Sequence, residues 1–97
     1  MDVKTQYNST NIVAAAPTTT LVATGSGVLH SITFNKPVAT GTCLFYNGIT
    51  AATLLGSITT PANPMPVTLI YDIVFAVGLT IVTGTAAQDI TISWAQG

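Results

Sequence analysis

Residues 65–83 read MPVTLIYDIVFAVGLTIVT, a stretch that is long and apolar enough to be a membrane-spanning helix or two successive β-strands. Asp72 lies near its middle, where a charged side chain costs about 3 kcal/mol in a bilayer, and Gly78 divides it. Most of its apolar residues are β-branched or aromatic, and these types are enriched in strands. We therefore expect two strands that meet near Gly78, and no membrane segment.

Apolar side chains recur at every second position in the first of these strands, as in a strand with one buried face. Its more apolar face comprises Val67, Leu69, Tyr71, Ile73 and Phe75. A second such face comprises Val28, His30, Ile32 and Phe34, and a third comprises Ile90, Ile92 and Trp94. The alternation predicts that His30 and Trp94 lie in the core or in an interface between subunits, where His30 would make a polar contact near the subunit axis.

Turn signals divide the rest of the chain into similar short runs that are rich in Val, Ile and Thr. Strands with turns about every 8–12 residues are typical of an all-β sandwich or barrel. The expected strands are residues 18–23, 28–35, 40–46, 53–59, 67–75, 79–83 and 89–95. The sequence therefore predicts an all-β, antiparallel fold of seven short strands, or eight if the N-terminal segment adds one.

Residues 1–17 are expected to form an N-terminal arm before a single domain that covers residues 18–97. The large apolar or aromatic side chains of this arm are Tyr7, Ile12 and Val13. Two interpretations stay open at this point: a frayed terminus, or an extended arm that adds a strand to the sheet of a neighbouring subunit. On the second interpretation, deleting residues 2–16 leaves the domain folded and weakens its attachment to a partner.

Charged residues are scarce in this chain. Of 97 residues only two are Lys and three are Asp, with no Arg or Glu, whereas 48% are hydrophobic. A disordered chain needs low hydrophobicity and high charge, and binding to nucleic acid by phosphate neutralisation needs clustered Lys and Arg, so both classes are excluded. Because a nearly uncharged surface favours association, we expect neighbouring protein chains to cover much of this one.

The residue types that catalysis and metal binding require are nearly absent. The chain has one His, one Cys and three Asp, and no two of these stand at a spacing typical of metal ligands. Cys43 alternates with Phe45, which predicts a buried and unreactive thiol. The carboxylates of Asp72 and Asp89 are expected to accept local hydrogen bonds or to pair with Lys36. We therefore expect no enzymatic activity, no cofactor and no bound metal.

Several segments, in their order along the chain, resemble elements of small virion proteins of tailed bacteriophages. Residues 27–32, GVLHSI, are similar to a Gly-x-Leu-His-Ser-Ile element of these proteins, and residues 44–48, LFYNG, are similar to the end of one of their strands. Residues 78–82, GLTIV, with GTA at 84–86 and DITI at 89–92, resemble their closing hairpin. The resemblance extends over most of the chain.

The resemblance implies a jelly-roll β-sandwich that acts as a capsid decoration (cement) protein on the outer capsid surface. Proteins of this kind are often homotrimers that bind the major capsid protein and stabilise the contacts between capsomers. The alternative is a tail, collar or fibre component that binds host glycans through exposed Tyr46, Tyr71 or Trp94. No nucleic acid or membrane partner is expected. The side chains expected at a subunit or capsid interface are Tyr7, Ile12, Val13, His30, Tyr46 and Trp94.

Overall fold

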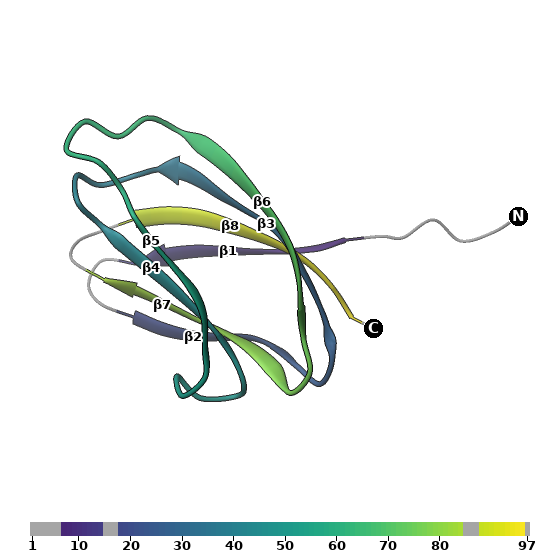
Figure 1. Cartoon of the computed structure of the whole chain (residues 1–97). Helices are drawn as coiled ribbons and strands as arrows, with labels where there is room; N and C mark the ends of the chain where they lie inside the picture. The colour runs from purple at the N-terminus through teal and green to yellow at the C-terminus, as the bar shows by residue number, and fades with distance from the viewer. Residues whose placement is uncertain (1–6, 15–17, 85–87, 97) are drawn as a thin grey trace, which may run out of the picture.

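The computed structural model of the chain describes residues 7–14, 18–84 and 88–96, and in this part all regular structure is β-strand (Figure 1). Within it, no helix is long and apolar enough to cross a membrane. The eight strands are β1 (Asn8–Ala14), β2 (Thr18–Thr24), β3 (Gly27–Lys36), β4 (Thr42–Asn47), β5 (Leu54–Thr59), β6 (Val67–Phe75), β7 (Gly78–Gly84) and β8 (Gln88–Gln96). The predicted all-β fold is confirmed.

The strands form two antiparallel sheets of four strands each. The first sheet has the strand order β1-β8-β3-β6, and the second sheet has the order β2-β7-β4-β5. The pairs β4·β5, β3·β6, β2·β7 and β1·β8 are nested along the chain, and successive pairs alternate between the sheets. This is the arrangement of a jelly roll, and Figure 1 shows its two sheets as the layers of a sandwich.

The long apolar stretch of the sequence contains β6 and β7, which lie in different sheets. The turn between them is held by Asn47, whose side-chain Oδ1 accepts hydrogen bonds from the backbone N–H groups of Ala76 (3.0 Å) and Val77 (3.1 Å). At Gly78, which follows directly, a Cβ atom would lie 2.9 Å from the carbonyl oxygen of Ala23. Glycine at this position therefore lets the chain pass close to β2 as it crosses between the sheets.

The core lies between the two sheets and consists mainly of large apolar side chains. Its fully buried members include Leu29, Ile32, Phe34, Phe45, Phe75, Leu79, Ile81, Ile90 and Ile92. Phe45 of β4 meets Tyr71 of β6 edge-on, with the ring centres 4.8 Å apart, so this pair links the sheets. The predicted burial of Cys43 is confirmed. Burial raises the pKa of its thiol to about 12, which makes the thiol unreactive at neutral pH.

The prediction that His30 shares a buried face with Ile32 and Phe34 is wrong. The register of β3 against both β6 and β8 shifts between Leu29 and Ser31, so the strand has a β-bulge at His30. Because of this extra residue, Leu29 and not His30 continues the buried face of the strand. The imidazole lies on the outer side of the first sheet, with 28% of the side chain exposed.

Trp94 lies between the core and the surface. Its ring packs against the core, as the alternation with Ile90 and Ile92 predicts, but it stays half-buried. The indole Nε1 donates a hydrogen bond of 3.1 Å to Oγ1 of Thr10. This bond ties β8 to its neighbour β1, so Trp94 contributes to the packing of the sandwich itself.

Part of the expected N-terminal arm is a strand of the sandwich. β1 pairs along its length with β8 of the same chain, and Ile12 is buried in the core. Neither a frayed terminus nor a strand given to a neighbouring subunit describes β1 in this structure. Deletion of residues 2–16 would remove an edge strand and a core side chain, so we now expect the truncated domain to be less stable.

Candidate functional site

Three polar or aromatic side chains gather on the outer side of the first sheet. His30 of β3 and Asp72 of β6 form a pair in which the imidazole Nδ1 and the carboxylate Oδ1 are 2.5 Å apart. The ring of Tyr7, directly before β1, stacks on the imidazole with 4.2 Å between ring centres and 14° between ring planes. We call these three residues the His30 cluster. Because they come from β3, from β6 and from the start of β1, they span the width of the sheet.

Two irregularities in the strands bring His30 and Asp72 together. The bulge in β3 between Leu29 and Ser31 turns His30 outward. Between the paired positions Leu29–Ile73 and Ser31–Ile70, β6 has one residue more than β3. Asp72 lies in this segment of β6 and adopts a positive φ of 48°. Asp tolerates this left-handed conformation better than most residues do. Bulges re-aim side chains, so the local backbone geometry builds the pair.

The pair holds the imidazole in one orientation. With Nδ1 engaged by Asp72, Nε2 is the ring nitrogen that points away from the pair. The side chain of Asp72 is itself 58% exposed, so it can accept a further hydrogen bond. The His30 cluster is therefore suited to a polar contact with another molecule. Among the described residues, no group of three or more His, Cys, Asp or Glu side chains is placed to hold a metal ion.

A second polar cluster lies towards the other end of β8. Oδ1 of Asp89 accepts hydrogen bonds from the side-chain amides of Asn11 (2.7 Å) and Asn35 (3.1 Å). The Asn35 amide also donates to Oγ1 of Thr91 at 2.9 Å. The bonds from Asn11 and Asn35, with the nearby charge of Lys36, lower the pKa of Asp89 below its ordinary value. This network joins β1, β8 and β3 side by side.

We expect the Asp89 network to make stability depend on pH in the acidic range. A carboxylate with a lowered pKa in the folded state stabilises the fold above its unfolded-state pKa, and this stability is lost as the pH falls through the folded-state value. The difference in unfolding temperature between wild type and Asp89→Asn should therefore be constant near neutral pH and should shrink below about pH 4. Thermal denaturation of both proteins from about pH 7 to about pH 2 measures this difference in unfolding temperature. A constant difference over this range would contradict the expectation.

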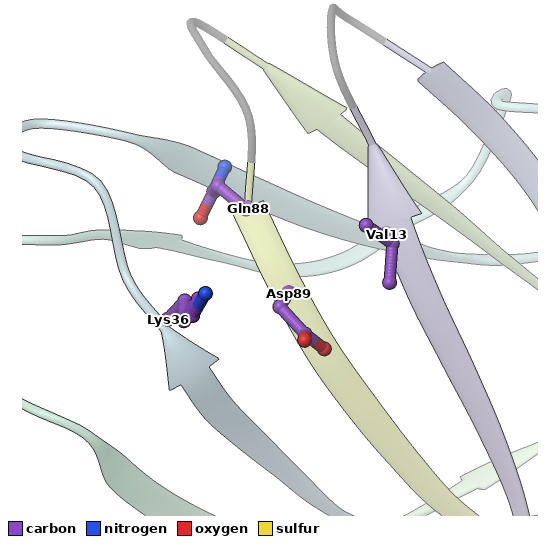
Figure 2. Close-up of a pocket in the computed structure, with 4 residues that line it drawn as sticks. All are labelled: Val13, Lys36, Gln88 and Asp89. Carbon is purple, nitrogen blue, oxygen red and sulfur yellow. The ribbon is translucent and has the colours of Figure 1, made fainter.

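Asp89 also lines a pocket of about 250 Å³ together with Val13, Lys36 and Gln88 (Figure 2). Gln88 is buried, and its Nε2 donates hydrogen bonds of 3.0 Å to backbone carbonyl oxygens at Thr42 of β4 and at the end of β7. The amide therefore ties β8 of the first sheet to the second sheet, and its Oε1 is covered by protein atoms. Oδ1 of Asp89 and Nε2 of Gln88 are engaged within the fold, whereas Oε1 of Gln88 has no hydrogen-bond partner among the described residues.

Much of the remaining surface is apolar, and charge is unevenly distributed over it. The charged residues in the described part are Lys36, Asp72 and Asp89, and all three belong to strands of the first sheet. The four strands of the second sheet contain no charged residue. The exposed large apolar or aromatic side chains are Tyr7, Val13, Leu21, Ile49, Leu54, Met65, Val67, Ile70, Val74 and Val77. Of these, only Leu21 and Leu54 belong to strands of the second sheet, which therefore exposes two large apolar side chains and no charge, whereas four belong to strands of the first sheet.

The side chains that the sequence predicted at an interface do not form one patch. Tyr7 and Val13 are exposed, and Tyr7 lies with His30 on the first sheet. Tyr46 is half-buried on the second sheet, while Ile12 lies in the core and Trp94 packs against it. The exposed Leu21 and Leu54 were missed, because their strands, TTTLVAT and LLGSIT, show no clear alternation. The pairing of Asp72 with His30 was missed as well.

The described residues form an eight-stranded jelly roll that carries little charge, and the strands of its second sheet carry none. No protein-family model, no curated protein and no solved structure matches the chain.

Proposed function

We propose that the protein is a structural virion protein of a tailed phage that decorates the outer capsid surface and binds the major capsid protein. The observation that carries the proposal is the surface, which exposes ten large apolar or aromatic side chains but, in the described part, only three charged residues. Such a surface is best accommodated when other protein chains cover it. Jelly rolls occur in viral capsid proteins, an analogy of fold that the resemblance of residues 27–32 to phage virion proteins makes more specific.

A decoration protein acts by contact and not by chemistry. Each copy bridges neighbouring capsid subunits, so the subunits separate only if its contacts break as well. Burial of apolar surface stabilises such contacts by about 25 cal/mol per Å², and a lack of ions avoids the cost of desolvating charges. The Phe45–Tyr71 pair between the sheets helps the sandwich to act as one body under tension. In the homotrimer that the resemblance implies, three copies would contact the capsid together, so the number of contacts with capsid subunits would be larger.

The second candidate function is that of a tail, collar or fibre component that binds host glycans. It is favoured by the His30 cluster, where the ring of Tyr7 is 46% exposed beside the exposed carboxylate of Asp72. Ligand sites combine apolar or aromatic surfaces with a few placed polar groups. However, Tyr46, Tyr71 and Trp94, the rings that this function was expected to use, are all half-buried. A stacking surface would therefore depend mainly on Tyr7.

The copy number of the chain in purified virions distinguishes the two candidates. We expect quantitative mass spectrometry to find amounts comparable to those of the major capsid protein, because a decoration protein repeats over the whole shell. A few copies per particle would favour the tail or fibre function instead. If the chain is missing from virions, the proposal is wrong.

Particles that lack the protein provide the functional test. We expect such particles to assemble but to release their DNA at a lower temperature than wild-type particles, because the bridging contacts are missing. Addition of the purified protein should restore the wild-type release temperature. A release temperature that does not depend on the protein would contradict the decoration function.

A further inference from the structure

An apolar surface on the outer side of the second sheet lies apart from the His30 cluster and from the pocket. One row of laterally paired residues crosses all four strands in the order Leu21, Thr80, Tyr46 and Leu54. The neighbouring row consists of Thr19, Val82, Leu44 and Ser57. We call these eight residues the second-sheet face. Each of the four strands contributes at least one large apolar or aromatic side chain to this face.

The exposed leucines of the second-sheet face lie on the two edge strands of the sheet, β2 and β5, and its centre is partly buried. Leu21 and Leu54 are 49% and 52% exposed. Thr80, which lies between the tall side chains of the first row, is already buried, and its Oγ1 donates a hydrogen bond of 2.8 Å to the backbone carbonyl of Gly48. A partner that covers the centre therefore leaves this hydroxyl satisfied. On the inner strands Leu44, Tyr46 and Val82 are half-buried, while Thr19 and Ser57 add polar groups at the edges of the face.

We infer that the second-sheet face binds the same face of a second copy of this chain. In a two-fold contact the same patch of each subunit meets the other, so any charge on the patch would come close to a like charge. The strands of this sheet contain no charged residue, so this repulsion does not arise. The two faces also have the same strand twist, and twisted sheets pack face to face as they do in a sandwich.

The size of the face predicts a weak contact. Its strands are 6–7 residues long. With about 3.3 Å per residue and about 4.8 Å between strands, four such strands give roughly 400 Å² in projection. A typical stable interface buries about 800 Å² per partner. We therefore expect a dissociation constant in the micromolar range, at about 1 µM or above.

Sedimentation velocity of the purified chain tests the contact without any virion component, so its result is independent of the proposed function. We expect the mass to double as the concentration rises from about 1 µM to about 500 µM. A two-fold contact gives even numbers of chains, so a hexamer would also support it if trimers form through other surfaces. A monomer or a trimer over the whole range would overturn the inference.

Charged substitutions locate the contact on the molecule. The double variant Leu21→Lys/Leu54→Lys should raise the dissociation constant by at least about tenfold, because like charges would then face each other. Ile70→Lys is the matched control, since Ile70 is 60% exposed on β6 of the first sheet. It should associate as the wild type does. Equal weakening in both variants would contradict the assignment to this face.

A mixture of opposite charges separates loss of contact from loss of fold. The Lys double variant and the variant Leu21→Asp/Leu54→Asp should each fail to self-associate, but the two variants should bind each other. This expectation holds whether Leu21 faces Leu21 or Leu54 of the partner, because opposite charges meet in both arrangements. If both variants are folded by circular dichroism and do not bind each other, the inference fails. If either variant does not fold, dilution of the ¹⁵N-labelled wild-type chain gives the answer. Amide signals of β2, β4, β5 and β7 should shift on dilution, and shifts confined to the first sheet would overturn the proposal.

Discussion

Phe45→Ala is expected to lower the free energy of unfolding by about 3–5 kcal/mol. The ring of Phe45 is fully buried, meets Tyr71 of the first sheet edge-on, and covers Gly56 on the neighbouring strand β5. Its removal leaves a cavity between two sheets whose strands are held by their hydrogen bonds, so the cavity cannot close fully. Because a domain has only about 5–15 kcal/mol of stability, the variant should be close to unfolding at moderate temperature.

Urea denaturation of wild type, Phe45→Ala and Phe45→Leu measures this effect. Leu keeps most of the apolar volume, so Phe45→Leu should cost clearly less than Phe45→Ala, at about 1.5 kcal/mol. If the Ala variant is no less stable than the Leu variant, the ring does not fill the space between the sheets as described.

Gly27→Ala is expected to cost about 3 kcal/mol although it adds a single methyl group. Gly27 is the first residue of β3, and a Cβ atom there would collide with the backbone carbonyl oxygen of Ala95 and lie 2.6 Å from Cζ of Phe75. Ala95 belongs to β8, which has neighbours on both sides, and Phe75 is fully buried. Neither obstacle can move without disturbing the sheet or the core, so the cost should lie at the upper end of the range for overpacked sites.

Thermal unfolding measures the cost at Gly27. In a domain of this size 1 kcal/mol corresponds to about 4–8 °C, so the midpoint of Gly27→Ala should fall by more than about 10 °C. Thr53→Ala, at an exposed loop position, is the control and should stay within about 0.5 kcal/mol of wild type. A midpoint for Gly27→Ala within the range of this control would show that the strand start has room for a side chain.

The strands could be predicted because two independent signals coincide in them. In β6 the alternation of side chains and the flanking turn residues give residues 67–75, which are the observed bounds Val67–Phe75. For β3 the predicted range, 28–35, differs from Gly27–Lys36 by one residue at each end. Neither signal says which strands are neighbours, since pairing depends on contacts between distant residues. The jelly-roll order was therefore an implication of the resemblance and not of the periodicity.

The His30 cluster could not be predicted because it depends on register. His30 and Asp72 are 42 residues apart in sequence, and they meet only because β3 pairs with β6 across a bulge. Strict alternation predicts that His30 points into the core and Asp72 points outward. One extra residue in β3 moves His30 to the outer side of the sheet, where Asp72 lies. Tyr7 joins them because β1 pairs with β8 of its own chain, a partner that the composition of the arm does not specify.

The place of β8 in the first sheet has a consequence for biosynthesis. β8 is the last of the eight described strands to be made, yet it lies between β1 and β3, which are made much earlier. Until β8 has been made, β1 and β3 have no strand between them, so the nascent polypeptide cannot close this sheet. Folding dominated by such distant pairings is slow, and unpaired strand edges stay open to aggregation until it ends. The first sheet can therefore close only after β8 has been made, and a chaperone that shields the unfinished domain should increase its yield.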